Sequence, residues 1–497
     1  MKLYWILLIS LAMLRPITVP ANDLAWVSIG EPVRALDSGF FGFNLEWIPF
    51  QLSAVDPQGR VSAELIERLR VFEGAYYRYP GGTVSNKFDW RKSIGAVEFR
   101  EGQISPWGSR IRNVFGLSEY FEFVRAVRGR PWYVLSLHGG ADCIGDRAAD
   151  AECVSSVARS TRNLMQWVLL NQIEGRPQPA SAAGCSLGAS CPVMYWELGN
   201  ETDHGKSPLS KEAYVVISRA VAGEVKEVFP QASMVPHMAT SPWGAIRSKT
   251  YRSYNVFVID ETDQYASDYA YHIYYDGIST RRASALVGDE LAAMLRRSDD
   301  SIWVTEHGKW PDRDPYKHSF SVKDGPTNHE AALSNADFLL KLSRLPHVRG
   351  AMAHALAGKG PWPMFFHDEK GALRTTAVFD ALSVLRKSMV GTVLSTKGEV
   401  PEKMEVQAYM SSDESKLFVV VVNRLDGVQT LTVQLNQGLQ GRFLFSSVCN
   451  FMDGDGDCVG ESKSALGWPN SVRQVGNGIE SLQPARSIRV IEFVVKS

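Results

Sequence analysis

The sequence has almost no net charge, few cysteines and no long apolar run beyond its first residues. Its 53 lysine and arginine residues nearly balance 54 aspartate and glutamate residues, which leaves a formal net charge of −1 over 497 residues. A balanced chain has no overall field that would attract nucleic acid or an acidic membrane. After the N-terminus, no segment is long and apolar enough to span a bilayer. We therefore expect no nucleic-acid partner and no membrane association beyond export.

The first 21 residues have the features of a signal peptide. A lysine precedes a mostly apolar run from Leu3 to Leu14, and Val19-Pro20-Ala21 is a plausible small-residue cleavage site. The run is too short to cross a bilayer as a helix. We expect residues 1–21 to direct export to a secreted or periplasmic location, with an uncleaved anchor as the alternative.

Cysteine is scarce, and its placement argues against a zinc site. The six cysteines form three pairs close in sequence, namely Cys143 with Cys153, Cys185 with Cys191, and Cys449 with Cys458. None has the CxxC or histidine spacing of a zinc site. Small loops in polar stretches are typical of disulfides in an exported protein. We predict three local disulfides, with zinc binding as the weaker alternative.

The segment "NFMDGDGDCVG" resembles a calcium loop, because Asp453, Asp455 and Asp457 occupy alternate positions. Position six holds Cys458 instead of glycine, and position twelve holds Ser464 instead of glutamate, so the calcium-loop pattern fails. A polar hairpin is the preferred interpretation, with metal binding as the weaker one. We predict no metal site and no cofactor for the protein.

Short apolar segments alternate with amphipathic segments over residues 38–384. Eight segments have the length and composition of strands: 39–46, 75–82, 132–140, 194–201, 232–238, 268–276, 302–308 and 350–356. Segments between them, such as 62–72, 117–129, 211–229 and 328–345, place apolar residues three and four apart, as helices do. No glycine-rich phosphate turn follows the first strand, which argues against a doubly wound fold. The pattern predicts an α/β fold, a (β/α)8 TIM barrel.

The last part of the chain, residues 385–497, has a different pattern. Segments 416–425, 428–435, 441–448 and 486–495 are short, rich in β-branched residues and separated by Gly, Asn and Asp turns. This pattern is typical of an antiparallel β-sandwich. Residues 22–37 contain one more strand-like run, which we expect to join that sandwich.

Polar and ionisable side chains stand at the ends of the predicted barrel strands. They are Glu46, Arg78, His138, Asn200, Glu201, His237, His272, Tyr274, Glu306, His307 and His354. Active sites of TIM barrels lie at the carboxyl ends of the strands, so we expect these side chains to meet at one mouth. The fourth and seventh strands both end in a glutamate, Glu201 and Glu306.

Two carboxyl groups that face each other across a pocket are what glycoside cleavage needs. One protonates the leaving oxygen, and the other attacks the anomeric carbon or activates water. The acid needs a raised pKa, and the nucleophile needs a cationic partner, for which Arg78 is the candidate. Each residue also has a simpler interpretation, since Arg78 could only neutralise Glu46, His272 could be a core histidine, and Tyr274 and Trp310 could cap the barrel.

The motifs "FGFNLEW", "YRYPGGTVSNKFDW", "WELGNE", "YAYHIYYDG" and "WVTEHG" resemble those of retaining glycoside hydrolases of the (β/α)8 clan A. In their order along the chain and in their residue types they are most similar to the family 51 α-L-arabinofuranosidases, and "WELGNE" is shared with the family 79 β-glucuronidase and heparanase group. The C-terminal strand "FVVVVNR" is also similar to the sandwich that accompanies the family 51 barrel. The resemblance implies a carbohydrate substrate and hydrolysis by double displacement.

Positions in these motifs imply roles for seven residues. The resemblance makes Glu201 the acid/base and Glu306 the nucleophile. It implies substrate contacts or support from Glu46, Arg78, Asn200, His272 and Tyr274, and Trp310 is a further candidate for sugar stacking. The chain departs from the arabinofuranosidase pattern at Thr83, and again at His307 and Gly308. These departures concern the sugar pocket and leave the catalytic pair in place, so the resemblance implies glycoside hydrolysis more directly than it implies arabinofuranose.

Three other interpretations stay open. Basic residues after the nucleophile (Lys309, Arg313, Lys317 and His318) would suit a uronic-acid glycan and a β-glucuronidase-like hydrolase. A non-catalytic carbohydrate-binding protein could use the same scaffold. A metal-dependent hydrolase could use His138, His237, His272 and His354, although the chain has no HxH pair. The linkage, endo or exo action and oligomeric state are not predicted.

Overall fold

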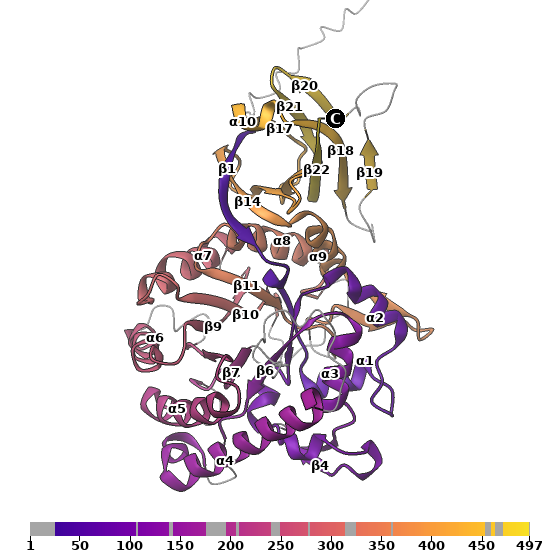
Figure 1. Ribbon diagram of the computed structural model, residues 1–497. Coiled ribbons are helices and arrows are strands. Elements are labelled where there is room, and N and C mark those ends of the chain that lie inside the picture. Colours follow the sequence, from indigo (N-terminus) through magenta and orange to yellow (C-terminus); the bar gives the residue numbers. More distant parts are fainter. Residues whose placement is uncertain are drawn as a thin grey trace, which may run out of the picture.

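Eight parallel strands form a closed barrel at the centre of the larger part of the molecule (Figure 1). The computed structural model describes residues 25–105, 108–138, 143–174, 195–204, 208–239, 249–276, 279–313, 325–358, 361–452, 459–462 and 471–496. The barrel strands are β2 (Phe41–Asn44), β3 (Tyr76–Tyr79), β6 (Arg130–Leu135), β7 (Tyr195–Leu198), β8 (Ser233–Pro236), β9 (Asp268–Tyr275), β10 (Ser301–Lys309) and β11 (Val348–Ala353). They pair in the order β8-β7-β6-β3-β2-β11-β10-β9, and a parallel bridge from His237 to Ala270 joins β8 to β9. The predicted (β/α)8 barrel is confirmed.

Helices follow the strands and cover the outside of the barrel. They are α1 (Trp47–Ala54), α2 (Ala63–Leu69), α3 (Leu117–Ala126), α4 (Ala151–Val168), α5 (Lys211–Val228), α6 (Lys249–Thr262), α7 (Thr280–Ala285), α8 (His329–Ser343) and α9 (Ala377–Ser388). Polar side chains mark several starts, because they accept hydrogen bonds from free backbone N–H groups of the first turn. Ser210 accepts from Ala213 at α5, and Asn328 accepts from Ala331 at α8. Among the described residues, none of the helices has the length and apolar character needed to cross a membrane.

Aromatic side chains fill the lower part of the barrel interior. Trp132 and Tyr195 stack with ring centres 4.6 Å apart, and the ring of Trp303 packs edge-on at 5.0 Å from Trp132. These rings and Tyr76 belong to one buried cluster that is separate from the core under the helices. Aromatic rings therefore fill the lower part of the barrel, and the polar candidate side chains lie at the carboxyl ends of its strands.

The second part of the molecule is a ten-stranded sheet that curls around a core of its own. Its order is β19-β18-β22-β16-β15-β14-β1-β17-β21-β20. The strands are β1 (Ala25–Leu36), β14 (Gly391–Glu399), β15 (Met404–Met410), β16 (Lys416–Asn423), β17 (Gln429–Leu435), β18 (Phe443–Phe451), β19 (Val459–Ser462), β20 (Val472–Val475), β21 (Gly478–Gln483) and β22 (Ser487–Val495). All neighbours are antiparallel except β1 and β17. Residues from both ends of this order share one apolar cluster, so the two halves of the sheet face each other as in a sandwich.

Strand β16 shows why this region reads as an unbroken apolar run. Alternate side chains of a strand point to opposite faces of the sheet. Leu417, Val419 and Val421 lie in the core of the second sheet, whereas Phe418, Val420 and Val422 belong to the core that the barrel helices share. Helices α8 and α9 lie between the barrel and this sheet (Figure 1). Both faces of β16 are therefore buried, and the two parts of the molecule pack tightly against each other.

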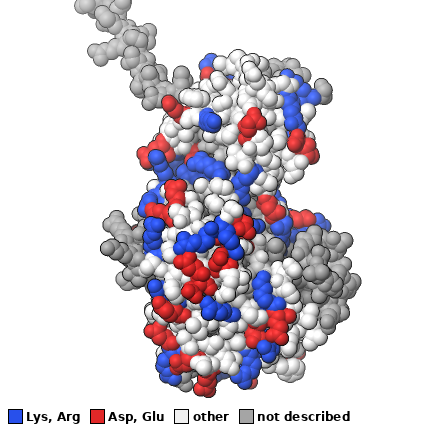
Figure 2. Space-filling view, turned by 60° about the vertical axis from the view of Figure 1, so that its left-hand side comes forward, with Lys and Arg blue, Asp and Glu red and all other residues white. Residues whose placement is uncertain are grey.

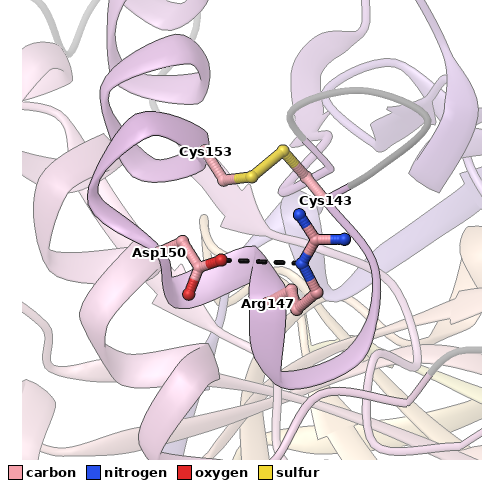
Figure 3. Close-up of a disulfide and its surroundings, with 4 residues drawn as sticks. All are labelled: Cys143, Arg147, Asp150 and Cys153. Carbon is pink, nitrogen blue, oxygen red and sulfur yellow. Dashed lines mark ion pairs between the residues drawn. A yellow bond between two sulfur atoms is a disulfide. The ribbon is translucent and has the colours of Figure 1, made fainter.

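A disulfide joins Cys143 to Cys153 at the start of α4, with a Cα–Cα distance of 5.7 Å (Figure 3). Inside this small loop, Arg147 and Asp150 form an ion pair of 3.7 Å. Cys449 is also disulfide-bonded. Its predicted partner Cys458, the pair Cys185 and Cys191, the Asp453–Asp457 loop and the expected signal peptide (residues 1–21) lie outside the described residues.

Charges of both signs are spread over the molecular surface. On the face in Figure 2, lysine and arginine side chains alternate with aspartate and glutamate side chains over both parts of the molecule. Several of these charges meet where the two parts join. Arg424 of the second sheet forms ion pairs with Asp276 at 3.3 Å and with Glu330 at 3.0 Å, and Lys341 of α8 pairs with Glu405 at 2.7 Å.

Candidate active site

Arg78, at the end of β3, lies at the centre of the barrel mouth and is completely buried. Its Nε and Nη2 atoms donate to the two oxygens of Glu197 at 2.7 and 2.8 Å. Its Nη1 donates to Glu306 at 2.8 Å and to Asn44 at 2.6 Å, and its Nη2 also donates to Asn200 at 2.7 Å. Burial disfavours the charge of Arg78, but the two carboxylates outweigh burial and raise its pKa above the ordinary value. One guanidinium thus joins four strands through fixed hydrogen bonds.

Glu197 of β7 is a structural partner and does not face the open mouth. Its side chain has no solvent exposure. Besides Arg78, the Trp132 indole N–H donates to its Oε2 at 2.7 Å, and the Thr305 hydroxyl lies 3.5 Å from its Oε1. Burial raises the pKa of Glu197, but the charge and hydrogen bonds of Arg78 with those of His237 hold it far below the ordinary value. The carboxyl group is an ionised anchor under the site.

Glu306 of β10 has the surroundings that a nucleophile needs. It accepts hydrogen bonds from Arg78 and from the Tyr274 hydroxyl, the latter at 2.9 Å to Oε2. The Nδ1 atoms of His272 and His354 lie 3.5 and 3.6 Å, respectively, from the same oxygen. Burial raises the pKa of this carboxyl, but the charges of these imidazole and guanidinium groups outweigh burial and lower it. Glu306 therefore stays ionised.

Glu201 lies just beyond β7 with a backbone φ of +47°. This left-handed conformation is uncommon for a residue with a side chain and is often found at functional sites. Its Oε1 lies 2.9 Å from His272 Nδ1, and its Oε2 lies 3.2 Å from His204 Nε2. Burial raises the pKa of Glu201, but the hydrogen bonds from His204 and His272 outweigh burial and lower it. The raised pKa expected for an acid is therefore not found here, because two imidazoles favour the carboxylate.

The two candidate catalytic carboxyl groups lie beside the same ring nitrogen of His272, whose Nδ1 is 2.9 Å from Glu201 Oε1 and 3.5 Å from Glu306 Oε2. One oxygen of each and one ring nitrogen of His272 all lie within 4.8 Å of one another. Retaining glycosidases hold their two carboxyl groups about 5–5.5 Å apart, whereas inverting enzymes need about 6.5–9.5 Å to admit a water molecule. The spacing is therefore that of the retaining class.

Asn200 and Asn86 hold the segment before Glu201 in place. The backbone N–H of Asn200 donates to Asn86 Oδ1 at 3.1 Å, and Asn86 Nδ2 donates to the Asn200 carbonyl at 2.6 Å. Asn200 Oδ1 accepts from Arg78, so the orientation of its amide is set. The Asn200 Nδ2 group is buried and has no hydrogen-bond partner among the described residues. It is available as a donor beside Glu201.

Glu46 and an aromatic wall complete the mouth. Glu46 precedes α1, and a Cβ atom on Gly82 would lie 1.9 Å from its Oε1, so only glycine fits beside it. Burial raises the pKa of Glu46 to about 6. Tyr274, Trp310 and Trp362 pack with ring centres 5.2–5.7 Å apart, next to the nucleophile. Partly exposed indole faces of this kind suit stacking on sugar rings.

The barrel mouth thus brings together all eight predicted site residues, but other strand-end residues serve differently. His138 lines a cavity of about 700 Å³ between β6 and α4, which Asn86 also lines. His307 is buried against Tyr275 and Phe338 on the outer side of β10. In the predicted basic patch, Lys309 is paired with Asp312 at 2.9 Å, and Lys317 and His318 lie outside the described residues.

Several contributors were missed by the motif analysis. His204 and Trp362 stand on loops, where strand periodicity offers no signal. Asn44, the last residue of β2, and Asn86, which follows β3, were visible only as polar residues near strand ends. The donor sets Glu197, His237, His272 and Glu201, His272, Glu306 are close enough to hold an ion. Their carboxylates are already hydrogen-bonded to Arg78 or imidazoles, so their chemistry is explained without a metal.

The architecture and the arrangement of the site resemble those of one class of protein, the retaining (β/α)8 glycoside hydrolases. Within it the chain resembles the family 51 α-L-arabinofuranosidases. Residues 68–280 match the family model described as the alpha-L-arabinofuranosidase 1 domain. That range includes Arg78, Asn200, Glu201, His272 and Tyr274, but it ends before Glu306.

Individual relatives agree with this resemblance. An intracellular exo-α-(1→5)-L-arabinofuranosidase from Streptomyces lividans is 23% identical over 220 residues, which are 43% of this chain and 30% of that enzyme. The structure of an α-L-arabinofuranosidase from Thermotoga maritima in complex with arabinose has a TM-score of 0.70 at 17% identity, covering 95% of this chain and 99% of that one. A family 51 α-L-arabinofuranosidase from Bifidobacterium longum gives 0.70 at 14% identity, with 94% and 99% coverage. The sequence match spans less than a third of the Streptomyces enzyme, and the structural likeness shows the shared fold.

Proposed function

We propose that the protein is a retaining glycoside hydrolase that cleaves terminal α-L-arabinofuranosyl residues from an oligo- or polysaccharide. The observation that carries the reaction is the pair of carboxyl groups of Glu201 and Glu306, with oxygens within 4.8 Å of each other and both beside Nδ1 of His272. The matched arabinofuranosidase domain and the Streptomyces relative support the sugar. The signal-like N-terminus supports export, and we include a secreted or periplasmic location in the proposal.

In the first step, Glu306 attacks the anomeric carbon while Glu201 gives its proton to the departing oxygen. Arg78 and Tyr274 hold the Glu306 oxygens in place, so the nucleophile is ionised and oriented before attack. The new bond is an ester between the sugar and Glu306. The Asn200 amide can donate to the sugar hydroxyl beside the reacting carbon, a hydrogen bond that strengthens in the transition state.

In the second step, Glu201 removes a proton from water, and the resulting hydroxide attacks the anomeric carbon and releases Glu306. Neutralisation of Glu306 in the ester removes a negative charge next to Glu201 and lowers its proton affinity. This change converts Glu201 from an acid into a base between the two steps. Two inversions at one carbon leave the product with the configuration of the substrate.

The test is turnover of 4-nitrophenyl glycosides, with α-L-arabinofuranoside beside pyranoside and uronide substrates. We expect the arabinofuranoside to be cleaved and the first product seen by NMR to have retained configuration. Glu306→Gln should abolish turnover, and Glu201→Gln should lower kcat/KM about 10²–10⁴-fold on poor leaving groups. Glu98→Gln, at an exposed position of the barrel, is the matched control.

Three results would overturn parts of this proposal. Inverted first product would exclude double displacement. Cleavage of uronides instead of arabinofuranosides would replace the sugar. No turnover of any glycoside by folded wild-type protein would favour a carbohydrate-binding role on a hydrolase scaffold.

A further inference from the structure

His204 stands at the rim of the mouth, three residues after Glu201. Its Nε2 lies 3.2 Å from Glu201 Oε2, and its Nδ1 lies 3.2 Å from Asp203 Oδ1. Its side chain is 41% exposed, whereas that of Glu201 is 19% exposed. The imidazole therefore connects the candidate acid/base to the solvent, with Asp203 orienting the ring from the other side.

The two imidazoles bound to Glu201 differ in burial and in their partners. His272 is completely buried, and burial lowers its pKa. His204 has two carboxylate partners, and the hydrogen bonds with Asp203 and Glu201 raise its pKa to about 10. A carboxylate can only accept hydrogen bonds, so the proton between His204 and Glu201 resides on Nε2 while Glu201 is ionised. Both imidazoles favour the carboxylate form of Glu201, and His204 is the one that is exposed and has a second carboxylate partner, Asp203.

We propose that His204 is a positioning residue that sets the protonation state of Glu201 and thereby the pH range of the reaction. The proposal rests on the acid/base role given to Glu201 under the proposed function. Other groups also face Glu201: His272 and Tyr274 from β9, Glu306 from β10, Glu46 after β2, and Arg78 of β3 through its bond to Glu306. Unlike these groups, His204 is exposed, so its charge can be removed without opening the buried network.

Proton balance shows how the pairing acts over one catalytic cycle. Glu201 gives a proton to the leaving oxygen and takes one from water, so His204 has no net gain or loss. The imidazolium stabilises the carboxylate form of Glu201, which is the form that the second step needs. The same contact disfavours the protonated form that the first step needs. His204 therefore favours hydrolysis of the glycosyl-enzyme and confines formation of that intermediate to acidic pH.

The first test is the pH profile of kcat/KM for His204→Gln, which keeps a hydrogen-bond donor and removes the charge. Without the imidazolium, Glu201 keeps its proton to higher pH, so we expect the alkaline limb to move upward by about one pH unit. The acidic limb, set by ionisation of Glu306, should stay in place. His367→Gln, on the exposed β12–β13 hairpin (Phe365–His367 and Leu373–Thr375), should leave both limbs unchanged.

The second test needs no activity. Histidine rings labelled with ¹⁵N are titrated by NMR, and the His204 signal is assigned by its absence from His204→Gln. Glu201→Gln should lower the pKa of His204 by about one unit, because one of its two carboxylates is gone. An unmoved alkaline limb in folded His204→Gln, or an unmoved His204 pKa in Glu201→Gln, would overturn the proposal. If wild-type protein cleaves no glycoside, the function fails, and this titration still decides whether the two residues are coupled.

Discussion

Replacing Glu197 by glutamine would separate stability from catalysis at this site. Glu197 and Glu201 lie four residues apart in the motif "WELGNE". Glu197 is completely buried against Arg78, whereas Glu201 is partly exposed and bonded to imidazoles. The same substitution at the two positions should therefore have opposite consequences.

The magnitude follows from the contacts. Glu197 accepts two hydrogen bonds from Arg78 and one from the Trp132 indole. In Glu197→Gln, an amide N–H₂ replaces one accepting oxygen and faces an N–H donor of Arg78 or Trp132. The buried Arg78 guanidinium also loses one of its two carboxylate partners. Breaking a buried ion pair by removing one partner costs about 3–5 kcal/mol. We expect Glu197→Gln to lower the free energy of unfolding by that amount and Glu201→Gln to lower it by about 1 kcal/mol or less.

Urea-induced unfolding followed by tryptophan fluorescence measures this difference, with both variants and wild type compared at pH 7. A pH series tests the direction in which this stability difference changes with pH. Because the folded state holds the pKa of Glu197 far below the ordinary value, its contribution is present above about pH 5 and is lost as pH falls through the acid range. The gap between wild type and Glu197→Gln should therefore shrink toward pH 3. Equal stability of the two proteins at pH 7 would refute the argument that Arg78 needs this partner.

Two further substitutions test single contacts. Glu46 has a pKa of about 6 because burial disfavours its charge, so its contribution to stability is lost as pH rises through 6. Glu46→Gln should therefore stabilise the protein by up to about 2 kcal/mol at pH 8 and have no effect at pH 4. Unfolding measured at both pH values tests this. A larger effect at pH 4 would contradict this sign. Tyr274→Phe removes a hydrogen bond to Glu306 and should lower kcat/KM about 10- to 100-fold with little change in Tm, since bonds to charged groups contribute about 1.5–3 kcal/mol. Unchanged kcat/KM would show that the hydroxyl does not act on the nucleophile.

Much of the architecture could be predicted because it follows regular spacing. The eight strands were recognisable from short apolar runs between amphipathic helices, and the rule that strand ends share one mouth placed Arg78, Glu201 and Glu306 together. The same rule could not tell which strand residues face inward. His307 follows Glu306 directly and is buried on the outer side, because alternate side chains point in opposite directions.

Contacts from loops could not be predicted in the same way. His204 reaches Glu201 only because the chain turns sharply at Glu201, whose positive φ no residue pattern announces. Trp362 lies in the segment after β11, and its approach to Tyr274 depends on how that segment folds back. The pKa of Glu201 was expected to be raised, but the hydrogen bonds from His204 and His272 lower it instead.

The position of β1 has a consequence for how the protein is made. This strand pairs with β14 and β17, whose residues follow it by more than 350 positions. During synthesis, β1 therefore emerges long before either of its neighbours exists, and its backbone groups have to wait for partners until the whole barrel has been translated. Pairing across so large a separation is slow and leaves an open strand edge in the meantime. A chain that ends before β14 would contain the complete barrel sequence, but β1 would have no neighbouring strand. We expect such a product to aggregate through the unpaired backbone groups of β1.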